Sequence, residues 1–160
     1  MTIAELPRLK LPPFDVRLRA ASATSDDAEI YDPLRAKWVA LTPEEWVRQH
    51  FVNLLRTQYG YSEHRLANEV SITLNGTARR CDTVVYDNTL QPLMIIEYKA
   101  PHIPLSQKVM DQVARYNMVL GASWLVLSNG LDTRAVRLTP PTYTILTTFP
   151  TNTDLRNNTE

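Results

Sequence analysis

The feature that most constrains the fold of this chain is a short apolar run, Leu93–Tyr98, that carries charge at its end. The run stops at Ala100-Pro101, and its length and composition are typical of a strand that is buried on both faces. Glu97 and Lys99 stand two residues apart, so their side chains project from one face of the strand, roughly 6.5 to 7 Å apart along it. A carboxylate and an ammonium on one face of a buried strand end predict a site there.

A second charged strand is expected just before this one. Asp82 begins an alternating run, and a short turn at Asp87–Gln91 returns the chain antiparallel, which can bring Asp82 beside Glu97. Two carboxylates and the Lys99 ammonium suit a hard divalent cation that keeps several waters and also binds a substrate phosphate. The residues therefore give a magnesium-site hypothesis. The alternative is a salt bridge at a strand end, because a D...E-x-K pattern also occurs by chance.

The composition limits the classes of protein to consider. A chain of 160 residues, 44% of them hydrophobic, can form one domain with a core. Its formal net charge of zero argues against a free-standing, high-affinity nucleic-acid binder, so any nucleic-acid contact is expected to be local or shared with a partner. The single cysteine, Cys81, excludes an internal disulfide, and neither a signal peptide nor an apolar run of ~20 residues is present. We expect a cytoplasmic protein that makes no use of the membrane.

A helix is expected to begin at Thr42-Pro43, because Thr at the N-cap, Pro at the first position and Glu45 at the third form a capping box. It should run to about Tyr59. Glu45 is assigned to the cap, whereas Glu44 is expected on the inward face and is the candidate for a third site carboxylate. The alternative for Glu44 is a favourable charge at the N-terminus of a helix.

A second helix is expected between the cap at Ser106 and Gly121. On it, Gln112 and Tyr116 are four residues apart and so lie one above the other. Such a pair is also common on the polar rim of an amphipathic helix. Its position directly after the Glu97-x-Lys99 strand favours a place near the site.

The remaining pattern divides the chain into three segments. Residues 1–40 read as an extended N-terminal arm, residues 41–149 as one domain, and residues 150–160 as a polar tail. Within the domain, an alternating run that ends at Asn75-Gly76 predicts a hairpin before Asp82. After the second helix come a buried strand, a turn at Asn129-Gly130, and two further strands.

The order helix, three strands, helix, strand, with Asp82 at the start of one strand and Glu97-x-Lys99 at the end of the next, resembles the PD-(D/E)xK nuclease superfamily. Cys81 stands where the motif has proline. Within that superfamily, the runs LTPEEWVRQHF, RRCDTVVYDNTLQPLMIIEYKAP and DQVARYNMVLGASWLVLSNG look like the N-terminal nuclease domain of type I restriction enzyme R subunits. The resemblance implies an α/β fold of the α+β type, with a restriction-endonuclease-like αβββαβ core and a mixed central sheet flanked by helices.

The same resemblance implies a metal-dependent DNA endonuclease. Asp82 and Glu97 would hold Mg²⁺, with Mn²⁺ as a possible substitute, and Lys99 would orient the attacking water or stabilise charge at phosphorus. Glu44 would be the carboxylate of the first helix. The implied partners are DNA, the motor and specificity subunits of a restriction system, or further copies of this chain.

Gln112 and Tyr116 resemble the Gln-x-x-x-Tyr element of RecB-like nucleases, which implies that they position DNA or support the active-site lysine. Two other interpretations stay open. The chain can be a non-catalytic module that binds nucleic acid or protein and keeps the nuclease fold, or its charged residues can form a buried ionic cluster with a structural role. Several basic residues near the site could contact phosphate or could form a solvated face, namely Arg79, Arg80, Lys108, Arg115 and Arg134.

Overall fold

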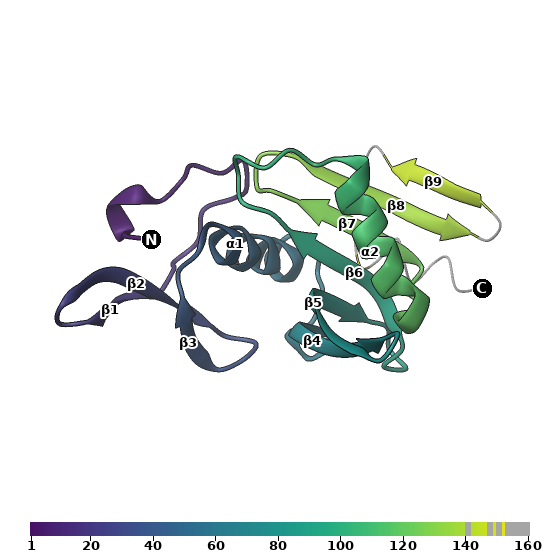
Figure 1. The fold of residues 1–160 in the computed structure, drawn as a ribbon, viewed down its shortest axis with the longest axis horizontal. Coiled ribbons are helices and arrows are strands. Elements are labelled where there is room, and N and C mark those ends of the chain that lie inside the picture. The colour runs from purple at the N-terminus through teal and green to yellow at the C-terminus, as the bar shows by residue number, and fades with distance from the viewer. Residues whose placement is uncertain (140–141, 147–148, 150–151, 153–160) are drawn as a thin grey trace.

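The computed structural model describes residues 1–139, 142–146, 149 and 152, and these form two sheets and two long helices (Figure 1). Two short 3-10 helices lie at Ile3–Glu5 and Glu63–Arg65. The other elements in chain order are β1 (Leu18–Ser22), β2 (Ser25–Asp32), β3 (Lys37–Ala40), α1 (Pro43–Thr57), β4 (Leu66–Leu74), β5 (Thr77–Tyr86), β6 (Pro92–Tyr98), α2 (Gln107–Leu120), β7 (Trp124–Ser128), β8 (Thr133–Thr139) and β9 (Thr142–Leu146). No helix among these residues is long and apolar enough to cross a membrane.

Helix α1 begins where its capping residues place it. The Thr42 side chain accepts a hydrogen bond from the Glu45 backbone N–H at 3.0 Å, and Pro43 fills the first helical position. Val47, Phe51 and other residues at helical spacing are buried, as the sequence pattern predicts. The apolar face of α1 therefore packs on the main sheet.

The main sheet is mixed and has the order β4-β5-β6-β7-β8-β9. β6 and β7 run parallel, and every other neighbouring pair is antiparallel. A parallel pair needs a long crossover, which α2 supplies. The predicted αβββαβ order and the α+β class are confirmed, and the crossover places α2 directly after the charged end of β6.

The two helices cover opposite faces of this sheet. On one side α1 packs Val47 in a cluster with Ile96 of β6, and on the other side α2 packs Val113 in a cluster with Ile95. Successive residues of a strand point to opposite faces, so Ile95 and Ile96 separate the two layers. The end of β6 is consequently reached from both helices.

Residues 1–40 form more than the extended arm that their sequence suggests. β1, β2 and β3 make a three-stranded antiparallel sheet, in which Ala28 and Ile30 are buried and packed with Trp46 of α1. The purple and blue segments of Figure 1 show this small sheet beside α1. The predicted tail from Pro150 lies, except for Asn152, outside the described residues.

Candidate functional site

Asp82 and Glu97 come together because β5 and β6 pair antiparallel. Thr83 lies opposite Ile96 in this pair, so the next positions outward are Asp82 and Glu97. The backbone N–H of Tyr98 donates to Asp82 Oδ2 at 2.8 Å, which fixes that carboxylate against the end of β6. The hairpin thus brings together the two predicted metal ligands.

Glu97 is buried, with Lys99 beside it. Lys99 Nζ lies 3.0 Å from Glu97 Oε1, as expected for side chains two apart on one strand face. The other oxygen, Glu97 Oε2, is buried and has no hydrogen-bond partner among the described residues. Burial, and then the charge of Asp82, raise the pKa of Glu97 to about 7, against the opposing attraction of Lys99.

Asp82 is held by a cation from the other side of the sheet. Its Oδ1 accepts a hydrogen bond from Arg48 of α1 at 2.8 Å. Burial raises the pKa of Asp82, although the nearby Arg48 guanidinium lowers it. Both oxygens of this carboxylate therefore have protein partners, whereas Glu97 Oε2 has none among the described residues.

Arg48 joins three carboxylates from three elements. Besides Asp82, it lies 2.8 Å from Glu45 of α1 and 2.7 Å from Glu69 of β4, and its own side chain is only 5% exposed. Burial works against the charged form of Arg48, but the carboxylates, Glu45 first, raise its pKa. Glu69 has a φ of 58°, and the pairing of β4 with β5 skips Glu69 and Asp82 at this point.

The cluster continues towards the N-terminal sheet. Arg35 pairs with both Asp32 and Glu45, and Asn68 donates to Asp32 at 2.8 Å. Thr83 in turn donates to Asn68 at 2.7 Å. We call the set Asp32, Arg35, Glu45, Arg48, Asn68, Glu69, Thr83 and Asp82 the α1 charge network.

The sequence prediction for the two helix carboxylates is wrong in its geometry. Glu45, assigned to the cap, is buried and binds Arg35, Arg48 and Gln49 with its side chain. Glu44, expected on the inward face, is half-buried, and its side chain makes no hydrogen bond or ion pair with any residue that the structure describes. The helix carboxylate that connects to Asp82 is therefore Glu45.

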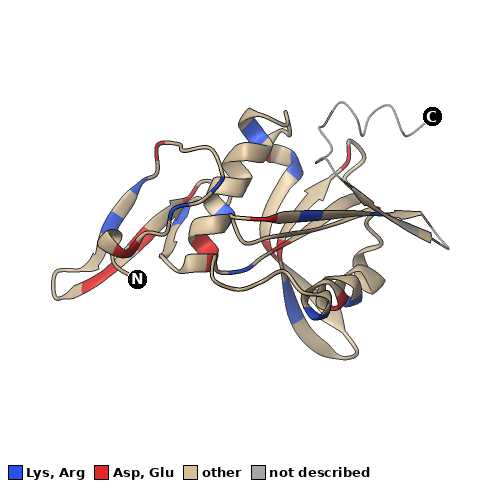
Figure 2. Cartoon of the chain, turned by 90° about the horizontal axis from the view of Figure 1, so that it is seen from above, with Lys and Arg blue, Asp and Glu red and all other residues tan. Residues whose placement is uncertain are grey.

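Gln112 and Tyr116 reach the site from α2. Gln112 Nε2 donates to Tyr116 Oη at 3.1 Å and lies 3.5 Å from Glu97 Oε1. Their predicted one-turn stacking thus places the amide at the oxygen that Lys99 also contacts. Figure 2 shows acidic and basic segments interspersed along the described chain, in keeping with its zero net charge.

Comparison with known proteins decides the family. Residues 43–150 match the family described as the N terminus of type I restriction enzyme R proteins (HSDR_N). The chain belongs to this HSDR_N family. A comparison with curated proteins gives no match.

One solved structure supports the HSDR_N fold, and a second resembles the chain more weakly. A fragment of a candidate HsdR subunit of a type I restriction enzyme from Vibrio vulnificus is 20% identical, with a TM-score of 0.58 over 73% of this chain. The chain spans 25% of the length of that protein. A candidate nuclease of DUF820 from Anabaena variabilis is 13% identical, with a TM-score of 0.46 over 83% of this chain and 86% of that one. The family match and the fold of the Vibrio fragment together identify this chain as an HSDR_N domain.

The donor set partly fits a divalent cation. Among the described residues no three His, Cys, Asp or Glu side chains are arranged to hold a metal ion. The two carboxylates of Asp82 and Glu97 are adjacent, however, and the unpartnered buried Oε2 of Glu97 is a ready oxygen donor. Mg²⁺ commonly takes one or two carboxylates and completes its shell with water and phosphate, so the pair matches this ion in number, although both oxygens of Asp82 already have protein partners.

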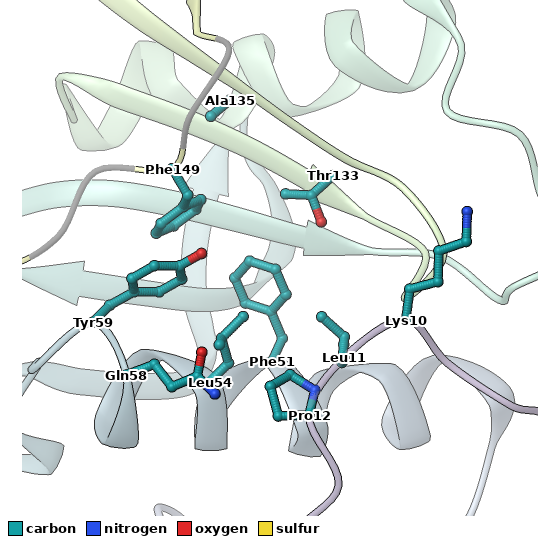
Figure 3. Close-up of a pocket in the computed structure, with 10 residues that line it drawn as sticks. All are labelled: Lys10, Leu11, Pro12, Phe51, Leu54, Gln58, Tyr59, Thr133, Ala135 and Phe149. Atoms are coloured by element: carbon teal, nitrogen blue, oxygen red, sulfur yellow. The ribbon is translucent and has the colours of Figure 1, made fainter.

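A separate hollow of about 410 Å³ on the α1 side has no part in this arrangement (Figure 3). Phe51, Tyr59 and Phe149 line it together with Lys10, and it contains neither of the site carboxylates. None of the predicted site residues lines it.

Sequence reasoning missed Arg48, Glu69, Arg35 and Asp32. A signal existed only for Arg48, because it stands three residues after Glu45 and so faces the same side of α1. The others reach the network through pairing of distant segments, and the sequence around them carries no local mark of it.

Proposed function

We propose that this HSDR_N domain is a metal-dependent endonuclease that hydrolyses DNA phosphodiester bonds. The observation that carries the proposal is the unpartnered, buried Oε2 of Glu97, next to Asp82 and Lys99. A buried carboxylate oxygen without a donor is costly unless a ligand satisfies it. In a nuclease-like domain the ligand that this arrangement suits is a divalent cation.

Asp82 and Glu97 are the residues that would hold Mg²⁺ or Mn²⁺. A bound ion supplies Lewis acidity, which lowers the pKa of water and neutralises charge on the scissile phosphate. The protein contributes by keeping the carboxylates in place: Arg48 and the Tyr98 N–H orient Asp82, while Lys99 and Gln112 flank one oxygen of Glu97.

The Lys99 ammonium is the positive charge that lies beside Glu97. Glu97 holds its Nζ at 3.0 Å, so the ammonium is oriented before substrate arrives. In hydrolysis, water adds to phosphorus, the bond to the leaving oxygen breaks, and the leaving oxygen takes a proton. A preorganised ammonium stabilises the negative charge that grows on the phosphate during this step.

A second candidate function is a non-catalytic binding module. It is favoured by Asp82, whose two oxygens both have protein partners, so that the carboxylate is satisfied without a metal. Under this alternative, Asp82 and Arg48 serve the fold and Lys99 is dispensable for binding.

The experiment is cleavage of linear and supercoiled plasmid with Mg²⁺ or Mn²⁺, alongside calorimetric titration with Mn²⁺. We expect wild type to cleave, and Lys99→Met and Asp82→Asn to lose on the order of 10² to 10³ in rate, the usual cost of one oriented charge. Lys37→Met on β3, an exposed lysine away from the site, is the matched control and should keep full activity. Circular dichroism checks that each variant folds.

The titration separates the two candidates. Mn²⁺ binding that Asp82→Asn weakens, with cleavage lost in Lys99→Met, supports the nuclease. Mn²⁺ binding without cleavage would mean that this chain does not act alone. We propose motor and specificity subunits of a restriction system as its partners, and their addition should then restore cleavage in wild type but not in Lys99→Met.

A further inference from the structure

A polar groove lies between the β4–β5 hairpin and helix α2. Its volume is about 600 Å³, and residues of both elements line it. The basic residues that line it are Arg79 of β5 and Lys108 and Arg115 of α2. One acid, Asp111, accompanies them, so the lining carries an excess of positive charge.

The three cations face the groove for geometric reasons. Lys108 and Arg115 stand seven residues apart on α2, so they lie on one helix face, two turns from each other. Arg79 pairs directly with Ile72 of β4, whose side chain packs in the cluster beneath α2. Residues directly opposite in an antiparallel pair point to one face, so Arg79 points to the α2 side.

These cations also lack protein partners. Within the described residues, the side chains of Arg79, Lys108 and Arg115 form no ion pair and no hydrogen bond, and all three residues are exposed. Asp111 brings one negative charge to the groove, but it forms no ion pair with the three cations, and its Oδ1 accepts a hydrogen bond from Gln107 at 2.8 Å. Three cations against one acid leave the hollow with a net positive charge, which favours the binding of anions.

The groove leads to the candidate catalytic centre. Gln112 and Tyr116 belong to its wall, and the Gln112 amide contacts Glu97 Oε1 at 3.5 Å. Glu97 and the groove therefore lie on the same face of the sheet. An anion that follows the groove past Gln112 arrives beside Glu97 and Lys99.

We propose that this groove is the track of a DNA strand, with Arg79, Lys108 and Arg115 each contacting a backbone phosphate. The inference rests on the proposed function and names the surface by which substrate reaches the site. Such contacts fix register and orientation without reading sequence. They also explain how a chain of zero net charge can bind DNA, because the positive charge is concentrated in one groove.

The salt dependence of binding tests this inference. Fluorescence anisotropy with a labelled DNA duplex, and with one of its strands, is measured in EDTA over a range of salt concentrations. Each phosphate contact contributes roughly 0.9 to the slope of log K against log[salt] on duplex DNA and roughly 0.7 on a single strand. We expect Arg79→Gln, Lys108→Gln and Arg115→Gln each to reduce the slope by about that amount.

Arg80→Gln is the matched control. Arg80 is the next residue of β5, is exposed, and pairs with Glu69 at 3.1 Å on the opposite face of the strand. Its substitution should leave the slope unchanged. Equal slopes for wild type and the three groove variants, or equal losses for Arg80→Gln, would overturn the inference.

Binding and cleavage can fail separately. Because EDTA removes the metal, a reduced slope in the groove variants supports the track even if wild type never cleaves DNA. Conversely, cleavage by wild type together with unaltered slopes in all three variants would keep the nuclease and reject this groove. If the substitutions reduce the slope more for the single strand than for the duplex, the single strand is the form that occupies the groove. The reverse result identifies the duplex.

Discussion

The two faces of the main sheet use charge in opposite ways. On the α1 side, Arg48 is 5% exposed and is bound to Glu45, Glu69 and Asp82. On the α2 side, the cations of the groove are exposed and have no partner among the described residues. Paired and buried charges define a geometry, whereas unpaired and exposed charges are available to a ligand. The difference separates the residues that hold the geometry of the site from those that we propose contact DNA.

Removal of Arg48 should have the largest effect. Arg48→Met keeps the length of the side chain but removes the cation that three carboxylates share, and it leaves Asp82 without an ion-pair partner among the described residues. We expect a loss of about 3 to 5 kcal/mol in the free energy of unfolding, the usual cost of breaking a buried ion pair. Urea unfolding measures it. Arg115→Met in the groove is the control and should stay within about 0.5 kcal/mol of wild type. Similar losses in the two variants would remove the distinction between the faces.

The two carboxylates of α1 allow a finer comparison on one helical turn. Glu45→Gln keeps the shape but removes the charge that Arg35 and Arg48 contact, and should cost about 1.5 to 3 kcal/mol. Glu44→Gln should change stability by no more than about 0.5 kcal/mol, because Glu44 binds none of the described residues. Urea unfolding of the pair decides it. A larger loss of stability for Glu44→Gln than for Glu45→Gln would indicate that Glu44, and not Glu45, occupies the inward position.

Acid should weaken the α1 charge network by protonating Asp32. We expect this effect on stability to be smaller than the effects of the Arg48 and Glu45 substitutions. Burial raises the pKa of Asp32, but hydrogen bonds from Asn68 and Arg35 outweigh this effect and hold the pKa below its ordinary value of 3.8. The unfolded chain therefore binds this proton more readily, so the stabilisation is present above pH 3.8 and is lost as the pH falls through the folded pKa.

Asp32→Asn should accordingly be less stable than wild type at neutral pH, with a difference that shrinks below pH 3.8. Thermal unfolding followed from pH 6 to the acid limit of folding measures this difference. A constant gap between the two proteins at every pH would show that the Asp32 charge does not contribute.

Local patterns predicted the elements that carry the site. The cap at Thr42, the turn before β6 and the spacing of Glu97 and Lys99 act over a few residues, and the structure has α1, the β5–β6 hairpin and the paired charges where those patterns place them. Pairing of β5 with β6 then brings Asp82 to Glu97 with no further information. These predictions succeeded because each depends on one turn or one hairpin.

The predictions that failed depend on distant segments. Whether Glu44 or Glu45 points inward depends on Arg35 and on β4, which approach α1 from outside it. The N-terminal sheet was missed because β2 alternates weakly: only Ala28 and Ile30 mark its buried face among acidic neighbours. Tertiary packing decides such cases, and a single sequence does not display it.

The reactivity of the single cysteine of the chain reports on motion at this site. Cys81 is fully buried directly before Asp82, and burial raises its pKa to about 12. A protonated, enclosed thiol is inert to alkylating reagents, so it reacts only when the strands around it open. The rate at which an alkylating reagent modifies Cys81 in native protein therefore measures how often the strands around Cys81 open. The measurement needs neither a label nor a mutation. A ligand that binds Asp82 and Glu97 should slow that rate.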